Sequence, residues 1–100
     1  MNNSDAQLKR ILIKATRDFL RETGAQRASR AVHLHAVLLD DLGLGSLERV
    51  MLLRGLEKRL ALRIPVEKVM AADTLRDVYH ILQQAHAGGE SELPDIALDE

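Results

Sequence analysis

The stretch that decides the fold reads LDDLGLGSLE and spans residues 39–48. Gly43 and Gly45 interrupt the chain, because glycine adopts backbone conformations that other residues avoid. Ser46 follows directly, and serine is among the preferred residues at the N-cap of a helix. Apolar residues then recur at helical spacing, which predicts a helix over residues 46–60 with Ser46 as its N-cap. The stripe expected to face the core consists of Leu47, Val50, Leu53 or Met51, Leu56 and Leu60.

Before this helix, the sequence predicts one long helix and a long connection. Apolar residues at helical spacing between residues 4 and 23 predict the helix. Residues 24–45 show no sustained period, although several of them are apolar and could attach the connection to a core. A connection of this length has room for a short helical turn of its own.

After this helix, two more helices are expected. Ile64-Pro65 ends the second helix, because a residue before proline is disfavoured in the helical region. A short helix is expected at about residues 67–72. The last helix is expected to begin near Thr74, with Thr74 and Asp77 as a capping box, and to run to about residue 86, where Gly88-Gly89 ends it.

This order predicts an all-α fold, a small four-helix bundle of three longer helices and one short helix. A long loop joins the first and second helices. The 100 residues include one Tyr, one Phe and no Trp, so the core is expected to be aliphatic. The absence of cysteine excludes disulfides and thiolate metal sites. No apolar run approaches a membrane span and the N-terminus lacks a secretion signal pattern, so we expect a cytoplasmic protein.

Charge divides the chain into two parts. The formal net charge is −1, but residues 87–100 contain five acidic residues and no Lys or Arg. Residues 1–86 therefore hold ten acidic and 14 basic residues. We expect a folded domain over residues 1–87 and an acidic, flexible tail over residues 88–100.

The chemistry of the deciding stretch follows from its place at a helix start. A serine in the first turn lies among unpaired backbone N–H groups, at the positive end of the helix dipole. A phosphodiester on its oxygen would lie in a favourable field. Taken alone, the pattern also fits a serine that only caps its helix.

The wider sequence resembles the acyl carrier and peptidyl carrier protein family over roughly residues 5–86. The resemblance rests on Asp41-Leu42-Gly43-Leu44-Gly45-Ser46-Leu47, on Leu56-Glu57-Lys58-Arg59-Leu60, on Ile64-Pro65-Val66-Glu67 and on Asp73-Thr74-Leu75-Arg76-Asp77-Val78. It implies a carrier domain over residues 1–87 that is no enzyme. Its cofactor would be 4′-phosphopantetheine, transferred from coenzyme A to Ser46. The arm would carry acyl or aminoacyl thioesters in fatty acid, polyketide or other specialised metabolism.

The resemblance also implies partners. They would be a phosphopantetheinyl transferase and acyl-loading or acyl-processing enzymes such as a ligase, a synthase or an acyltransferase, meeting a monomeric carrier. The residues expected to bind them are Asp41, Leu47, Glu48, Arg49, Met51 and Arg54. Two departures from the family pattern suggest specialised partners: Gly45 stands where Asp is usual, and the second helix is basic rather than acidic.

The sequence also fits other classes of protein. The chain could be a helical protein-interaction or nucleic-acid-binding module with an unmodified Ser46, since the second helix is basic. His33 and His35 are expected to be surface residues rather than metal ligands, because no third ligand is evident. A Ser–His–Asp hydrolase ranks lowest, since a bundle of this size offers little pocket. Composition does not tell whether the core shelters a fatty chain or stays closed.

Overall fold

The helices of the computed structural model follow the expected order. The structure describes residues 3–99, with side chains described over residues 5–87. The helices are α1 (Asn3–Glu22), α2 (Gln26–Ser29), α3 (Ser46–Leu60), α4 (Val66–Ala71) and α5 (Leu75–Asp99). Over residues 3–99 there is no strand, only an isolated bridge between Val37 and Thr74. The predicted all-α class and the helix order are confirmed, and α2 is the short turn within the long connection.

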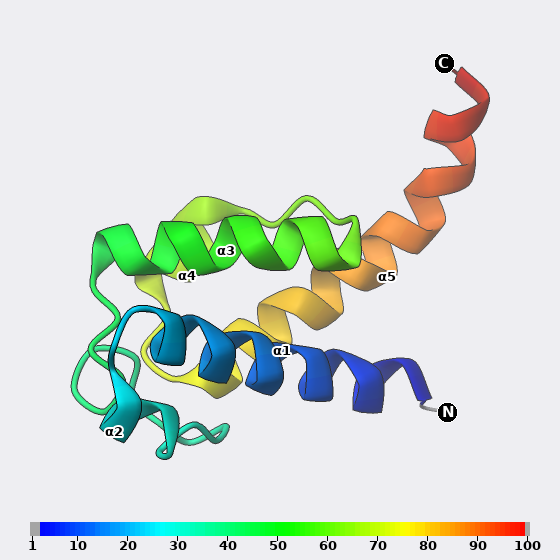
Figure 1. Ribbon diagram of the computed structural model, residues 1–100. Helices are drawn as coiled ribbons and strands as arrows, with labels where there is room; N and C mark the ends of the chain where they lie inside the picture. Colours follow the sequence, from blue (N-terminus) through cyan, green and yellow to red (C-terminus); the bar gives the residue numbers. More distant parts are fainter. Residues whose placement is uncertain (1–2, 100) are drawn as a thin grey trace.

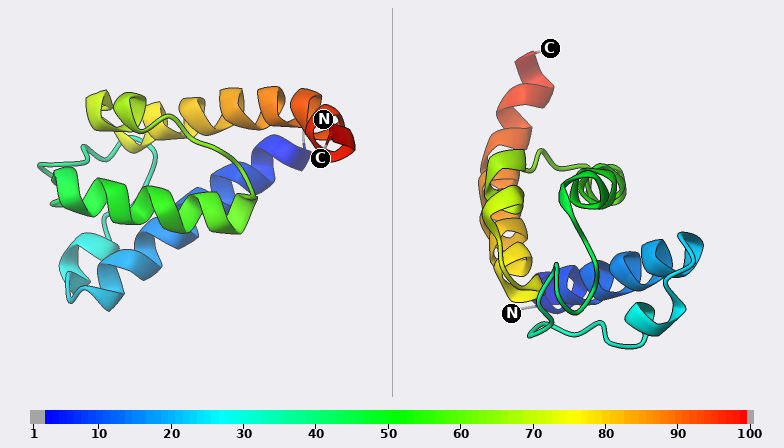
Figure 2. Two further views of the ribbon diagram at one scale, coloured as in Figure 1. Left: turned by 90° about the horizontal axis from the view of Figure 1, so that it is seen from above. Right: turned by 90° about the vertical axis from the view of Figure 1, so that its left-hand side faces the viewer.

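The helices pack around a single core. Helix α1 contacts α2, α3 and α5, while the short helix α4 contacts both α3 and α5. Figure 1 shows α1 and α3 running in opposite directions, so the end of α1, helix α2 and the start of α3 lie at the same end of the molecule. The left view of Figure 2, from above, shows the same arrangement. None of the described helices is long and apolar enough to cross a membrane.

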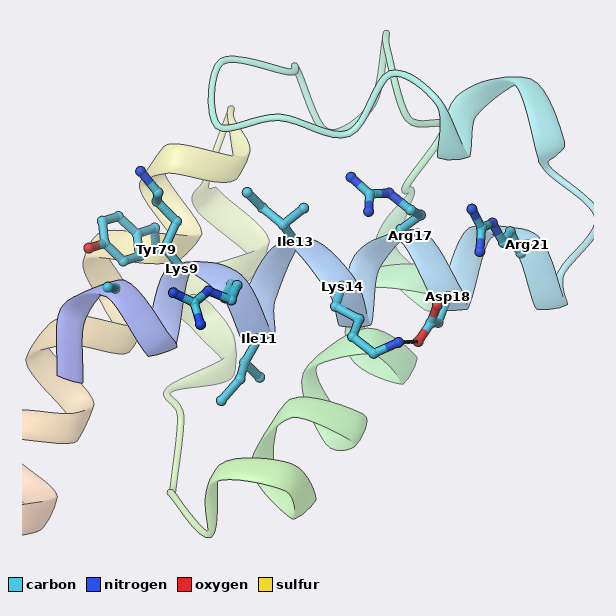
Figure 3. A pocket seen from close by; sticks show the side chains of 10 residues that line it. Lys9, Ile11, Ile13, Lys14, Arg17, Asp18, Arg21 and Tyr79 are labelled. Atoms are coloured by element: carbon cyan, nitrogen blue, oxygen red, sulfur yellow. Dashed lines mark hydrogen bonds and ion pairs between the residues drawn. The ribbon is translucent and has the colours of Figure 1, made fainter. Parts of the chain in front are cut away.

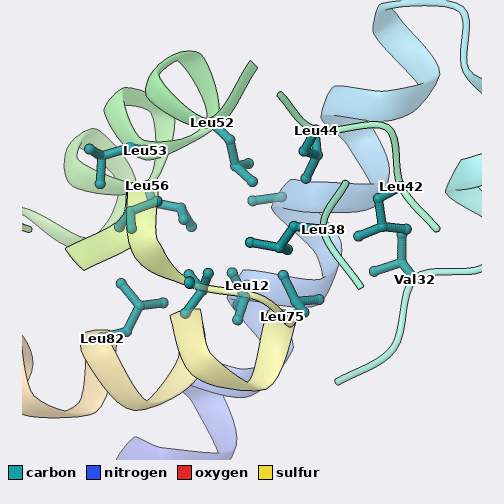
Figure 4. Close-up of a cluster of buried hydrophobic side chains, with 14 of the residues drawn as sticks. Leu12, Val32, Leu38, Leu42, Leu44, Leu52, Leu53, Leu56, Leu75 and Leu82 are labelled. Atoms are coloured by element: carbon teal, nitrogen blue, oxygen red, sulfur yellow. The ribbon is translucent and has the colours of Figure 1, made fainter. Parts of the chain in front are cut away.

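The core is aliphatic, as the composition predicts. Figure 4 shows its side chains converging from α1, the connection, α3 and α5. Burying each leucine of this kind contributes about 1.5–3 kcal/mol relative to its exposure. The leucines that are at most 1% exposed are Leu12, Leu38, Leu42, Leu44, Leu56, Leu75 and Leu82. Three of these seven belong to the connection, so the connection is part of the core.

The predicted inward stripe of α3 is wrong in part. Leu52, Leu53 and Leu56 are buried, whereas Leu47 is 68% exposed. Val50 and Leu60, the other two members, are only half-buried. Helix α3 carries large apolar residues on two opposite faces, and spacing alone does not reveal which face meets the other helices.

The predicted end of the last helix at Gly88-Gly89 is also wrong, because α5 continues to Asp99. Glycine costs a helix about 1 kcal/mol relative to alanine, but it permits the helical backbone. Figure 1 shows this last part of α5 extending away from the other helices. The side chains of residues 88–99 lie outside the described ones, and the flexible tail expected over residues 88–100 stays a prediction.

Candidate functional site

The loop before α3 is closed by its own hydrogen bonds. The carboxylate of Asp41 accepts a hydrogen bond from the amide of Val37 at 2.8 Å. The amide of Asp41 donates to the carbonyl of Val37 at 2.9 Å, and that of Gly43 donates to Leu39 at 2.9 Å. Gly43 has a φ of +68°, a conformation that glycine adopts without a steric cost. The loop therefore has a defined shape that requires glycine at one position.

The same loop is attached to the start of α5. The amide of Leu38 donates to the carbonyl of Asp73 at 2.8 Å, and that of Leu75 donates to Ala36 at 3.0 Å. The side chains of Leu38, Leu42 and Leu44 are buried beneath the loop. Backbone hydrogen bonds and buried side chains together therefore fix the position of the segment before α3.

Ser46 lies one position further into α3 than predicted. The N-cap is Gly45, in an extended conformation, and Ser46 is the first helical residue. The predicted role of Ser46 as the N-cap is therefore wrong. The amide of Gly45 donates to Oε1 of Glu48 at 3.1 Å, so Glu48 supplies the side-chain half of a capping box that Gly45 cannot supply. Ser46 is exposed, and its hydroxyl makes no hydrogen bond with the residues that the structure describes.

The first turn of α3 offers backbone donors beside this hydroxyl. The first amides of a helix have no partner within it, and those of Ser46, Leu47 and Glu48 meet no acceptor among the residues that the structure describes. They lie at the positive end of a helix of 15 residues. A phosphate ester on the Ser46 oxygen fits this environment, because both the amides and the dipole favour a negative charge there.

Three of the residues expected to bind partners share one exposed face of α3. Leu47, Met51 and Arg54 follow at intervals of four and three residues, which places them on the same side of a helix. Leu47 is 68% and Met51 49% exposed, and Arg54 is exposed as well. These three residues, called the Leu47 face below, begin directly beside Ser46.

The other three expected partner residues make hydrogen bonds within the protein. Asp41 and Glu48 accept hydrogen bonds from the amides of Val37 and Gly45, as described above. The guanidinium of Arg49 donates to four backbone carbonyls. Its Nε donates to Leu44 at 2.9 Å, and its Nη1 donates to Met70 and Ala72 at 2.9 Å each and to Val69 at 3.3 Å. Arg49 therefore ties α3 both to the loop before it and to the end of α4.

Sequence reasoning missed this contribution of Arg49 because the carbonyls belong to residues 20 to 23 positions away. One signal was present. Arg49 precedes Leu52, Leu53 and Leu56 by three, four and seven residues, the spacing of one helical face. An arginine on the buried stripe indicates a guanidinium that must find acceptors inside the protein.

The acidic side chains of α3 also make hydrogen bonds within the protein. Glu57 accepts a hydrogen bond from the amide of Ile64 at 2.9 Å, and both Glu48 and Glu57 are half-buried. The exposed charged side chains of this helix are all basic, namely Arg54, Lys58 and Arg59. Arg59 lies 3.9 Å from Asp18 of α1, the longer of two ion pairs that Asp18 makes.

Ser46 lines neither the groove beside the start of α3 nor the basic depression along α1. A groove of about 830 Å³ runs between the end of α1, helix α2, the loop and the start of α3, where Glu48 and Met51 line it. A second depression of about 580 Å³ follows α1 and is basic (Figure 3). In it Lys14 pairs with Asp18 at 3.2 Å, and no residue of the loop or of α3 takes part.

The alternative sites find no support in the described residues. His33 and His35 are exposed, with ring centroids 6.3 Å apart. No group of three or more histidine or carboxylate side chains among residues 5–87 could hold a metal ion. No hydrogen bond in this part of the chain joins a histidine to the hydroxyl of Ser46, which a serine hydrolase would need.

Comparisons with known proteins bear on this site. The family model described as "Phosphopantetheine attachment site" matches residues 17–82. The matched region starts within α1 and ends within α5, so it includes the loop, Ser46, the Leu47 face and Arg49. A search of curated proteins found no match to the chain, and a search of solved structures found none either.

Proposed function

Because the chain belongs to the phosphopantetheine attachment site family, we propose that Ser46 is the residue that carries its 4′-phosphopantetheine arm. Domains of this family are non-catalytic carriers with the arm covalently attached, so this chain is a phosphopantetheine carrier protein. The cargo and the pathway are part of the proposal. We propose acyl or aminoacyl thioesters, in a specialised lipid, polyketide or other secondary-metabolite pathway of the cytoplasm.

The observation that supports Ser46 is its exposure at the first position of α3, where its hydroxyl makes no hydrogen bond within residues 5–87. Gly45, and not Ser46, caps the helix, so the hydroxyl is free to be esterified without a loss of helix stability. Free amides in the same turn favour the negative charge of a phosphodiester. The bound arm supplies a thiol, which the chain itself lacks, since it contains no cysteine.

On this proposal the protein does no bond-making of its own. It holds the hydroxyl in place through the rigid loop and presents the Leu47 face beside it. A tethered cargo meets partner enzymes at a high effective concentration, because each transfer becomes an intramolecular event once the partner is docked.

The surface around Ser46 favours partners with an acidic surface. Carriers of this family interact in general with phosphopantetheinyl transferases and acyl-processing enzymes. Here the exposed charges of α3 are Arg54, Lys58 and Arg59, which favour an acidic partner surface. The exposed side chains of Leu47 and Met51 provide apolar contact, and methionine adapts to more than one partner.

The experiment that tests Ser46 is intact mass spectrometry. The full chain is incubated with coenzyme A and a broad-specificity phosphopantetheinyl transferase. We expect a mass increase of one phosphopantetheine in the wild type and in Ser91→Ala, and none in Ser46→Ala. An increase in Ser46→Ala would place the attachment elsewhere. No increase in the wild type with several transferases would favour the protein-interaction or nucleic-acid-binding alternative.

A further inference from the structure

Arg49 lies one turn after Ser46 and crosses from α3 to the end of α4. Three of its four hydrogen bonds go to the carbonyls of Val69, Met70 and Ala72. The last carbonyls of a helix have no partner within it and lie at the negative end of its dipole. A cation is therefore well placed there, and the guanidinium of Arg49 adds polar contacts to the apolar packing of α3 against α4.

Beneath Arg49 the space between α3, α4 and α5 is apolar and small. The free volume is about 10 Å³, which is room for about one water molecule. An apolar cavity that admits a benzene molecule has about 150 Å³. Besides Arg49, the side chains around this space include Leu52, Leu53, Leu56, Ile64, Val69 and Val78.

From this geometry we infer that Arg49 is a latch that keeps cargo on the arm out of the core. The inference rests on the proposed attachment at Ser46. An apolar chain tethered at the start of α3 would gain by entering the aliphatic interior, part of which lies under Arg49. Entry requires α4 to move away from α3, which breaks three charge-assisted hydrogen bonds. The carbonyls of Met70 and Ala72 then lose the donor that Arg49 supplies, while that of Val69 keeps the amide of Ala72 at 3.2 Å.

The latch also indicates a class of cargo. A long alkyl chain held outside the protein stays exposed to water, which is unfavourable in proportion to its apolar area. A short or polar acyl or aminoacyl group loses little by such exposure. The structure therefore assigns short or polar thioesters to this carrier, in preference to long fatty chains.

The Nε bond of Arg49 to Leu44 adds a second effect, because it fixes the loop that presents Ser46.

The test compares thioesters of different chain length on the same protein. Ser46 is loaded from acetyl-, hexanoyl- or decanoyl-coenzyme A, loading is verified by intact mass, and thioester cleavage by hydroxylamine is timed. A thioester that is hidden for most of the time reacts only through its minor exposed state. We expect wild-type rates within about twofold of one another for the three chains, and in Arg49→Ala a decanoyl rate at least about threefold slower than the acetyl rate.

The control variant is Arg63→Ala, which removes an exposed arginine just after the same helix whose side chain makes no hydrogen bond inside the described part of the protein. It is expected to behave as the wild type. A merely structural role of Arg49 would change all three rates alike, so the dependence on chain length is the decisive readout. If Arg49→Ala does not fold, Arg49→Lys replaces it, because lysine keeps the positive charge and lacks the planar guanidinium. The decanoyl thioester of this variant is also expected to react more slowly than its acetyl thioester.

The outcomes separate the two proposals. A wild type that accepts no phosphopantetheine contradicts the proposed function. A wild type that is loaded but protects its decanoyl thioester contradicts the latch and leaves the carrier function intact. Equal rates for all chains in a folded Arg49 variant also contradict the latch, because something other than Arg49 would then exclude the chain.

Discussion

The two glycines before Ser46 adopt different backbone conformations. Gly43 has a φ of +68°, whereas Gly45 has a φ of −80° that any residue can adopt. An added Cβ meets nothing within 4 Å at Gly43, and at Gly45 it meets only Oε1 of Glu48, at 3.1 Å. The sequence motif makes the two positions look equivalent, but the structure requires glycine only at residue 43.

We therefore expect Gly43→Ala to lower the free energy of unfolding by about 1 kcal/mol, because an L-residue is strained at positive φ. Gly45→Ala is the matched variant, and it is expected to change that free energy by less than about 0.5 kcal/mol, since the flexible end of Glu48 can shift. Urea denaturation of both variants gives the comparison. Equal losses at the two positions would contradict this assignment.

Arg49 shows the limit of sequence reasoning at the scale of a residue. Its charge and its place near Ser46 suggested a surface residue that binds partners, yet it makes four internal hydrogen bonds. The acceptors are backbone carbonyls, which every residue possesses, so no side-chain pattern marks them in advance. Only the packing of α4 against α3 brings them within reach.

At the scale of elements, helix α5 begins where the sequence predicts. The carboxylate of Asp77 accepts hydrogen bonds from the amides of Asp73 at 3.0 Å and Thr74 at 3.1 Å. The amide of Asp77 in turn donates to the hydroxyl of Thr74 at 3.3 Å, which completes the predicted capping box. Start signals of this kind are local and can be predicted, whereas the end of α5 and the buried face of α3 depend on the rest of the fold.

This capping box predicts a dependence of stability on pH. The hydrogen bonds from Thr74 and then from Asp73 lower the pKa of Asp77 below its ordinary value of 3.8. A carboxyl whose pKa is lowered in the folded state stabilises the protein above its unfolded pKa, and this contribution is lost as pH falls through the folded pKa. Asp77→Ala is expected to cost about 1 kcal/mol near neutral pH, with the difference from the wild type shrinking below about pH 4.

Urea denaturation across that range measures the effect. Asp73→Ala serves as the control, because the exposed side chain of Asp73 makes no hydrogen bond or ion pair within the described residues. It is expected to show a smaller loss at neutral pH. A difference between Asp77→Ala and the wild type that stays constant down to the acid limit would contradict the role of the ionised carboxylate.

At the scale of the whole molecule, the helix order was predictable because apolar spacing and capping residues in the sequence mark each helix. The place of Ser46 at the start of α3 was predictable for the same reason, because the glycines before it and the apolar spacing after it mark where this helix begins. The Leu47 face was harder to predict. Leu47 looks like a core residue by spacing, and its exposure follows only from α3 turning Leu52, Leu53 and Leu56 toward the other helices.

The extent of the folded domain gives the last prediction. Within the described residues, the buried apolar side chains run from Leu8 to Leu82, and the family match ends at residue 82. Deleting residues 88–100 removes five acidic residues and no basic one, which changes the formal net charge from −1 to +4. We expect the shortened chain to unfold in urea within about 0.5 kcal/mol of the full chain, because the core is unchanged.

The same deletion is expected to leave the loading of Ser46 in place, while its more positive charge speeds association with an acidic partner at low salt. Intact mass and the salt dependence of the loading rate measure these two effects. A loss of more than about 1 kcal/mol would show that the end of α5 belongs to the fold. A loading rate with the same salt dependence as that of the full chain would show that the acidic segment takes no part in partner encounter.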